Sequence, residues 1–163
     1  MPSAVLERHP ASPCAALRGI EASVTRRAAS LEVSYALEGE IDRLRIGRSG
    51  PLWQHTCCEV FIVEALPAYR EYNFSPSGEW AAYEFVRYRE GAPFAAPDPR
   101  IAVKRGPGRL ELSASIPASP DRLRIGLSVV VEDESGALSY WALKHAPGKP
   151  DFHHPAAFAL ELE

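Results

Sequence analysis

The sequence predicts an all-β protein, a two-sheet antiparallel β-sandwich that occupies residues 1–163 as a single domain. Several short segments alternate apolar and polar residues, which is the period of a half-buried strand. Turn signals separate these segments at roughly 8–12-residue spacing, as is typical of sandwiches and barrels. No window carries an apolar stripe at helical spacing over three turns. We prefer the sandwich because the chain length suits two sheets around one core.

The first predicted strand covers residues 31–37, where Leu, Val and Tyr alternate with Glu, Ser and Ala until Gly39. A brief strand is expected at 44–46. Residues 57–63 are apolar except for Glu59, so we expect them to form a central strand.

Three hairpins and a closing strand follow in the prediction. The first hairpin turns at Ser75-Pro76-Ser77-Gly78, and Gly-rich or acidic turns mark the others. Residues 92–99 read as a surface loop, and 67–71 could form one helical turn. We expect nine or ten strands in all. The arms of the hairpins and the closing strand cover residues 71–74, 79–87, 101–104, 110–116, 123–132, 138–143 and 157–162.

Composition and charge indicate a folded cytoplasmic protein. Hydrophobic residues make up 46% and charged residues 24% of the chain, near the averages of globular proteins. A net charge of -3 with three scattered lysines leaves no basic stripe, so we expect no nucleic-acid partner. The N-terminal residues lack the basic and apolar regions of a secretory signal, and no apolar run is long enough for a membrane span. Three cysteines without paired spacing favour reduced thiols.

Three short blocks combine aromatic and polar residues: LWQHTCC at 52–58, YREYNFSPSGEWAAY at 69–83 and YWALKHAPGKPDFHH at 140–154. We expect them to form an aromatic-lined concave face, because flat aromatic rings with polar neighbours suit sugars and similar ligands. The alternative is that the rings fill the interior of the sandwich. The expected stacking residues are Trp53, Tyr72, Trp80 and Trp141. The expected polar contacts are His55, Asn73, Ser75, Lys144 and His145.

The histidine-rich end of the third block suggests a second hypothesis. His153, His154 and Asp151, joined by His145, offer imidazole and carboxylate ligands for a divalent metal. Solvated or hydrogen-bonded histidines are the alternative, because the spacing is not that of a known metal motif.

Two features of the central strand allow more than one interpretation. Cys57 and Cys58 are expected to be small buried side chains. Glu59 needs a partner if it is buried, so it either pairs structurally or lies at the floor of the site. The common hydrolase, nucleotide and zinc-protease motifs are absent from the sequence, so nothing supports catalysis. An acid–base pair of His145 with Asp151 or Glu59 would require both groups at one ligand.

The three blocks, in this order, resemble a family of bacterial DOMON-like proteins that is related in fold to type 9 carbohydrate-binding modules. The resemblance spans nearly the whole chain and implies a β-sandwich with a ligand pocket or groove on one sheet. Relatives in the wider group bind sugars or a b-type haem. By block position, Trp53, Asn73, Trp80 and Trp141 correspond to the sugar-contacting residues.

The resemblance therefore leaves two functions open. The first is non-catalytic binding of a saccharide or similar small polar ligand, with no cofactor. The second is a haem or metal protein, in which His145, His153 or Lys144 would ligate. The haem-binding relatives use an axial Met, whereas the only Met here is Met1.

Overall fold

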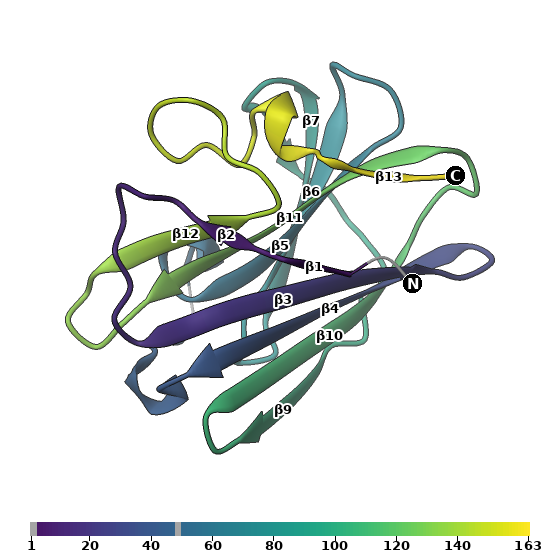
Figure 1. The fold of residues 1–163 in the computed structure, drawn as a ribbon. Helices are drawn as coiled ribbons and strands as arrows, with labels where there is room; N and C mark the ends of the chain where they lie inside the picture. Colours follow the sequence, from purple (N-terminus) through teal and green to yellow (C-terminus); the bar gives the residue numbers. More distant parts are fainter. Residues whose placement is uncertain (1–2, 48–49) are drawn as a thin grey trace.

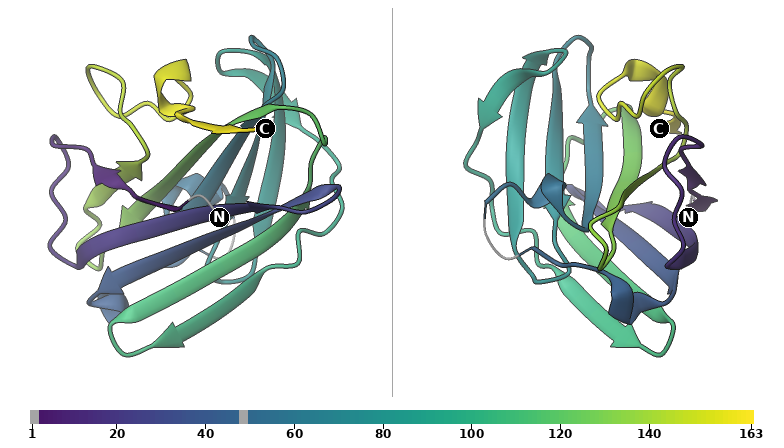
Figure 2. Two further views of the ribbon diagram at one scale, coloured as in Figure 1. Left: turned by 45° about the vertical axis from the view of Figure 1, so that its right-hand side comes forward. Right: turned by 90° about the vertical axis from the view of Figure 1, so that its left-hand side faces the viewer.

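Two antiparallel sheets pack face to face in the computed structural model, which describes residues 3–47 and 50–163 (Figure 1). This arrangement confirms the predicted β-sandwich. Figure 2 shows the two layers from two further directions. No helix in the described ranges is long and apolar enough to span a membrane.

The first sheet has five strands and lies in front in Figure 1. β3 and β4 form its central hairpin, and β4 pairs along its whole length with β10. In spatial order the strands are β1 (Ser3–Val5), β3 (Leu17–Arg26), β4 (Ser30–Gly39), β10 (Arg109–Pro117) and β9 (Ala102–Gly106).

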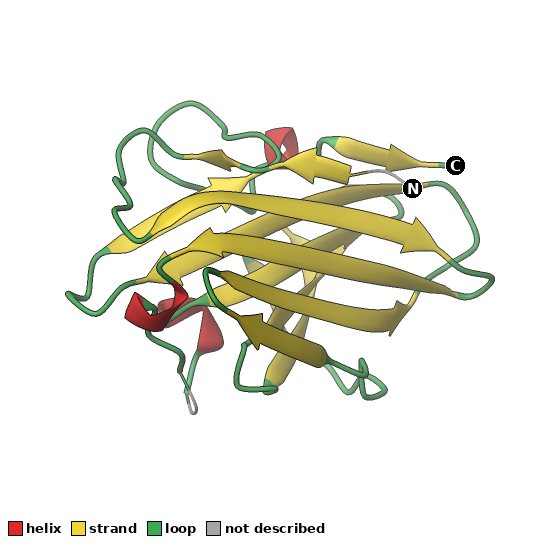
Figure 3. Cartoon of the chain, turned by 60° about the horizontal axis from the view of Figure 1, so that its bottom comes forward, coloured by secondary structure: helices red, strands yellow, loops and turns green. Residues whose placement is uncertain are grey.

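The second sheet has eight strands, with β5 and β11 near its centre. In spatial order they are β2 (Glu7–Arg8), β12 (Leu138–Ala142), β11 (Leu123–Glu132), β5 (Cys57–Val63), β6 (Tyr69–Phe74), β7 (Trp80–Arg87) and β8 (Glu90–Pro93), while β13 (Leu160–Leu162) pairs with the start of β11. Three short 3₁₀ turns complete the described secondary structure: η1 (Ile41–Arg43), η2 (Leu52–Gln54) and η3 (Pro155–Ala157) (Figure 3).

The main core lies between the sheets and follows the two-residue period of the strands. Val33, Tyr35 and Leu37 of β4 face Cys58 and Val60 of β5 within one buried cluster. Tyr35 crosses the core and its hydroxyl donates a 2.6 Å hydrogen bond to the backbone carbonyl of Glu59. The polar end of this tyrosine is thereby satisfied, and the two sheets are joined through a backbone group.

A second, smaller cluster lies on the other face of the eight-stranded sheet. Phe61 and Val130 of the sheet pack there against Phe152 and Phe158, which come from the C-terminal segment drawn in yellow in Figure 1. Gly126 of β11 lies beneath this cover, where an added Cβ would be 2.9 Å from Cδ1 of Phe158. Both faces of the central strands are consequently buried, which explains why residues 57–63 are apolar except for Glu59.

The three predicted hairpins are confirmed, and several details differ. Residues 44–46 form only an isolated bridge between Leu44 and Asp133, because the chain turns through η1 just before them. The predicted helical turn at 67–71 is wrong, since β6 begins at Tyr69. Residues 90–93 pair with β7 and form strand β8, although a loop was predicted from residue 92. The predicted closing strand at 157–162 is shorter in the structure, because η3 precedes it and β13 begins only at Leu160. The prediction omitted β1, β2, β3 and β8 and included a strand at 44–46 that does not form, so the described residues hold thirteen strands instead of nine or ten.

Candidate functional site

A pocket of about 580 Å³ opens on the face of the eight-stranded sheet that points away from the five-stranded sheet. Strands β5, β6, β7, β11 and β12 form its floor, and the segments around η2 and before η3 form its walls. The pocket residues combine aromatic rings with carboxyl, cationic and imidazole groups. They are Trp53, Gln54, Glu59, Glu71, Tyr83, Phe85, Arg89, Val130, Leu138, Tyr140, Lys149, Pro150, Phe152 and His153.

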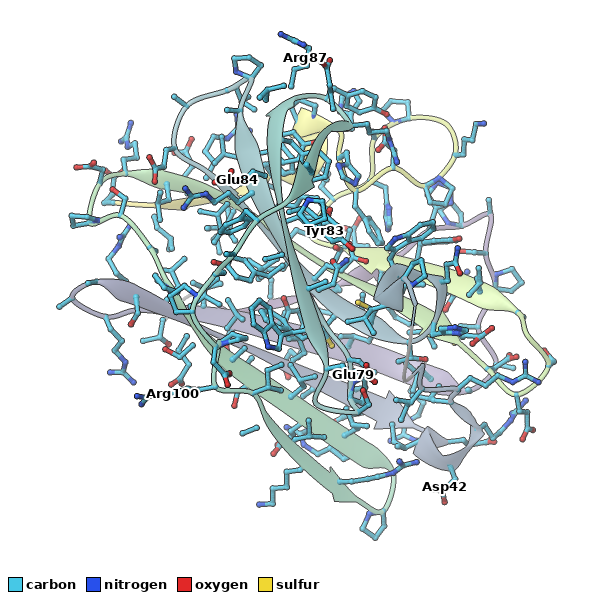
Figure 4. All side chains as sticks on the ribbon, turned by 180° about the vertical axis from the view of Figure 1, so that it is seen from behind. Asp42, Glu79, Tyr83, Glu84, Arg87 and Arg100 are labelled. Carbon is cyan, nitrogen blue, oxygen red and sulfur yellow. The ribbon has the colours of Figure 1, made fainter. Side chains whose placement is uncertain are left out.

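Strand alternation selects which residues reach this pocket. Side chains at every second position of a strand share a face, so Glu59 points opposite to Cys58 and Val60, which lie in the main core. The same rule separates Tyr83 from its neighbour Glu84 on β7, and the two labelled side chains lie on opposite sides of that strand in Figure 4.

Register places the polar floor residues next to one another. Glu59 on β5 is the cross-strand neighbour of Asn73 on β6 and of Ser128 on β11. The next row on this face contains Glu71 on β6 and Tyr83 on β7. Neighbouring strands are about 4.8 Å apart, so these side chains are in contact range across the floor.

Glu59 and Glu71 form a buried carboxyl pair, with only 3% and 5% of each residue exposed. The two groups lie within hydrogen-bonding reach of each other. The Asn73 amide, oriented with its nitrogen toward the pair, donates to Glu71 Oε2 at 2.7 Å. His153 Nε2 lies 3.5 Å from Glu71 Oε1. Since these donors converge on Glu71, the proton of the pair resides on Glu59, which donates it to Glu71.

The hydrogen bonds around His153 fix its protonation state. The backbone N–H of Arg89 donates to the Tyr69 hydroxyl at 3.0 Å, and that hydroxyl lies 2.8 Å from His153 Nδ1. The Tyr69 hydroxyl has its own proton available for Nδ1, and the lowered pKa of His153 favours the neutral tautomer in which Nδ1 carries the lone pair. The ring is neutral, with its hydrogen on Nε2 facing Glu71.

Burial controls the acid–base properties of this group. It raises the pKa of Glu59 well above its ordinary value, and the charge of Glu71 adds to the effect. Burial raises the pKa of Glu71 to about 7, although the hydrogen bond with Glu59, the charge of Arg89 and the Asn73 amide limit the rise. Burial and the Arg89 guanidinium lower the pKa of His153 to about 4. The floor consequently holds one negative charge or less near neutral pH.

The walls of the pocket are largely aromatic. The Trp53 indole comes from η2 and is 49% exposed, the largest exposed ring of the site. Tyr83 and Phe85 project from β7, and Tyr140 projects from β12. Flat apolar faces surrounding a polar floor suit a ligand that has both kinds of surface.

Two cationic side chains lie at the pocket, and their surroundings differ. The Arg89 guanidinium donates to Asp151 Oδ1 at 2.9 Å, and Asp151 also accepts from the Tyr88 hydroxyl at 2.5 Å. These donors lower the pKa of Asp151 despite its partial burial. Lys149 is exposed at the rim. The charge of Arg89 is thus matched within the protein, whereas that of Lys149 faces water.

Three residues predicted to stack on a ligand lie on the opposite face of the sheet. Tyr72 and Trp141 are buried in the main core, and Trp80 packs against it. The Trp141 indole nitrogen donates to the Ser139 hydroxyl at 3.0 Å. Alternation is the physical reason, because each of the three is one position away from a residue that faces the pocket side. Of the four predicted rings, only Trp53 lines the pocket.

The predicted polar contacts are also spread over the molecule. His55 Nδ1 lies 2.7 Å from Glu132 Oε1. The hydroxyl of Ser75, in the turn between β6 and β7, donates to the backbone carbonyl of Gly47. Lys144 is exposed, and His145 lies 2.7 Å from the carbonyl of Glu7. None of these four lines the pocket, whereas Asn73 lies beside it as the donor to Glu71.

The three candidate metal ligands do not converge. His153 faces the carboxyl pair, while Nδ1 of the exposed His154 accepts from the backbone of Ala156 at the start of η3. Asp151 is held by Arg89 and Tyr88. Among the residues that the structure describes, no three or more His, Cys, Asp or Glu side chains gather as metal ligands.

Both cysteines of the central strand are buried as expected, and burial raises the pKa of each thiol. A buried, protonated thiol is a poor nucleophile. Glu59 has a structural partner and also lies at the floor of the pocket. The partner is a second carboxyl group, that of Glu71, and not a basic or aromatic residue.

Several pocket residues escaped the sequence interpretation, notably Glu71, Tyr83, Arg89 and Tyr140. Alternation could have identified Tyr83 and Tyr140, since each has the parity of the outward face of its strand. The convergence of Glu71 on Glu59 depends on strand register, for which the sequence carries no direct signal.

The fold resembles that of a protein from Bacteroides uniformis that is described as a proposed carbohydrate-binding protein. The TM-score is 0.67 at 14% identity, over 96% of this chain and 83% of the other. At this identity the similarity shows a shared fold. No family model and no curated protein matches the sequence, so the DOMON resemblance stays a prediction.

Proposed function

We propose that the protein binds a saccharide in the pocket on the eight-stranded sheet and releases it unchanged. The observation that carries the proposal is the half-exposed Trp53 indole on a wall above the Glu59–Glu71 floor. A sugar ring has apolar C–H faces and polar hydroxyl edges. An aromatic ring accommodates the faces, and buried carboxyl oxygens accept hydrogen bonds from the hydroxyls.

The carboxyl pair favours binding over hydrolysis. Glycoside hydrolases of the common types hold two carboxyl groups about 5–5.5 Å or about 6.5–9.5 Å apart, so that the sugar or a water fits between them. Glu59 and Glu71 lie within hydrogen-bonding reach of each other, which is closer than either arrangement requires. The similar fold of the Bacteroides uniformis protein, given its description, is a second line of support.

Trp53 is the first residue to test. Replacing it by alanine removes the exposed ring, and aromatic contacts are worth roughly 0.5–1.5 kcal/mol beyond the area they bury. We therefore expect Trp53→Ala to weaken saccharide binding roughly tenfold or more, measured by isothermal titration calorimetry against a panel of saccharides. The melting temperature should change little, because the ring is half exposed.

Trp141→Phe is the matched control. Its ring is buried in the main core and does not line the pocket, so this variant should lose stability and keep its affinity. Loss of binding in Trp141→Phe with normal binding in Trp53→Ala would place the ligand elsewhere. An absorbance spectrum of the purified protein addresses the haem alternative, since a Soret band would contradict the saccharide proposal.

A further inference from the structure

The pocket floor holds an arrangement that folding alone does not favour. Two carboxyl groups are buried side by side, although burying such groups costs free energy. Neither Glu59 nor Glu71 forms an ion pair with Lys or Arg among the described residues, and His153, which faces Glu71, is neutral. Strongly perturbed titratable groups of this kind cluster at functional sites.

Ser128 gives a second, independent sign of a ligand at this floor. It lies next to Glu59 in register, on the same face of the sheet, and is only 2% exposed. Its hydroxyl oxygen has no hydrogen-bond partner among the described residues. Buried polar groups in proteins are nearly always satisfied, so an unpaired hydroxyl beside Glu59 favours a further polar group at this end of the floor, although Ser128 itself does not line the pocket.

The walls above the floor also suit a positive charge. Trp53, Tyr83, Phe85, Tyr140 and Phe152 surround the pocket. The faces of aromatic rings attract cations, by about 0.5–1 kcal/mol at exposed sites and about 2 kcal/mol or more when the cation is desolvated. An aromatic enclosure with carboxylates at its base combines the two common means of holding an ammonium group.

The other charged groups around Glu59 and Glu71 do not cancel the preference of the pocket for a positively charged ligand. Arg89 is paired with Asp151, which offsets part of its effect on the two carboxyl groups, and Lys149 is exposed at the rim, where water and salt screen its charge. Cys57, Tyr69 and Tyr83 are neutral near pH 7, since burial raises the pKa of each. The titratable or charged groups facing the pair from neighbouring elements are Cys57, Tyr69, Tyr83, Arg89, Lys149, Asp151 and His153.

We infer that the saccharide bound here carries a free, protonated amino group, which is placed between Glu59, Glu71 and the Ser128 hydroxyl. This inference rests on the proposed function. A primary ammonium has three N–H donors, one for each of these acceptors. A divalent metal fits less well, because Glu59, Glu71 and the neighbouring His153 do not form a group that could hold a metal ion, and the described residues contain no other such group of three.

Binding of the amine changes the proton content of the pair. In the free protein Glu59 donates its hydrogen to Glu71. When the ammonium arrives, Glu59 releases that proton to solvent, and the N–H groups of the ligand take its place. The floor then contains two carboxylates and one ammonium. Since the free floor carries one negative charge or less near neutral pH, binding of a protonated amine releases at least one proton from the pair.

Three β-1,4-linked trisaccharides test the inference, because they differ only at the second carbon of each sugar. The trimer of glucosamine carries amines, that of N-acetylglucosamine carries neutral amides, and cellotriose carries hydroxyls. Calorimetry at pH 7 in two buffers of different ionisation enthalpy measures affinity and proton release together. We expect the glucosamine trimer to bind at least about tenfold tighter than the other two, with release of a proton.

Two variants locate the effect on the acid pair. Glu71→Gln removes the anion and should reduce the affinity for the glucosamine trimer at least about tenfold more than it reduces the affinity for cellotriose. Glu59→Gln keeps a donor to Glu71, so it should fold, retain part of the affinity and release about one proton fewer than the wild type. Melting temperatures of both variants check folding, and Glu59→Gln keeps the test decisive if Glu71→Gln is unfolded.

The outcomes separate the inference from the proposed function. Equal or tighter binding of cellotriose or of the N-acetylated trimer would overturn the amine inference and leave saccharide binding intact. Proton release in Glu59→Gln that equals the release in the wild type would also overturn the inference. Binding that is lost after dialysis against a chelator and restored by Ca²⁺ would make the pair a metal site. Failure of all three trimers to bind would contradict both proposals.

Discussion

Replacing His153 by glutamine measures the protonation state on which the floor network depends. The side chain of His153 is 15% exposed and lies against the rings of Phe61 and Phe85, each 5.1 Å away between centroids. Glutamine does not titrate, yet its amide can still face Glu71 and Tyr69. The variant loses the ring contacts equally at every pH, so the pH dependence of the stability difference isolates the charge of His153.

The expected size follows from the pKa of His153, which is lowered from 6.5 to about 4. A lowered pKa in a base means that the unfolded chain takes up a proton before the folded protein does. The stability contribution of the neutral ring is complete above pH 6.5 and is lost as the pH falls toward 4. A difference of one pH unit between the two pKa values corresponds to about 1.36 kcal/mol of stability. Between pH 6.5 and pH 4.5 the free energy of unfolding of the wild type should therefore fall by about 2.7 kcal/mol relative to that of His153→Gln.

Glu71 has the opposite effect, and it hides the loss when the wild type is studied alone. Its pKa is raised from 4.5 to about 7, so its contribution is present at low pH and is lost as the pH rises from 4.5 to 7. Between pH 4.5 and 6.5, the contributions of His153 and Glu71 to the free energy of unfolding change with pH by similar amounts and in opposite directions. Only the comparison of the two proteins separates them.

Urea denaturation of both proteins at pH 7.5 and pH 4.5 provides the measurement. With an unfolding slope of roughly 2 kcal/mol per molar urea, the relative midpoint should shift by about 1.3 M between the two pH values. A difference that does not change with pH would refute the neutral assignment. A shift in the opposite direction would mean that His153 is a cation paired with ionised Glu71, and the tautomer argument from Tyr69 would be wrong.

Two further substitutions test the packing that supports the site. Tyr35→Phe leaves the Glu59 carbonyl without its donor in the core, so we expect a loss of roughly 1–2 kcal/mol in urea denaturation; an unchanged midpoint would show that the carbonyl finds another partner. Gly126→Ala places a Cβ 2.9 Å from Phe158 and should destabilise by about 1–3 kcal/mol. Gly106→Ala on β9, where nothing lies within 4 Å, is the control, and equal effects of the two substitutions would refute the steric argument.

Much of the fold could be predicted, because a strand with one buried face alternates apolar and polar residues along the sequence. The outward face of β4 is polar, so its alternation is plain, and β5 reads as continuous because both of its faces are covered. The edge strands β1, β2 and β8 are two to four residues long, too short to show a period. The omitted β3 does alternate, with Ile20, Ala22 and Val24 buried, so its signal was present in the sequence.

The site was harder to predict, because residues that are close together in the sequence of a strand lie on two opposite faces of the sheet. The block 69–83 contains Glu71 and Asn73, which lie on the pocket side. It also contains Tyr72, which lies in the main core, and Trp80, which packs against that core. Reading the block as a unit combined two faces that the sheet separates. The pairing of Glu71 with Glu59 arises from the register of β5 and β6, which forms only when the strands associate.

The position of Glu59 on β5 also determines how parts of the pocket exchange with solvent. Every residue of this strand is buried, and its backbone is paired on both sides with β6 and β11. Amide hydrogens of the pocket floor should therefore exchange with deuterium only through global unfolding, whereas those of the wall segment around the exposed Lys149 should exchange through local opening. A ligand that touches both parts would slow exchange at the walls and raise the free energy of global opening at the floor.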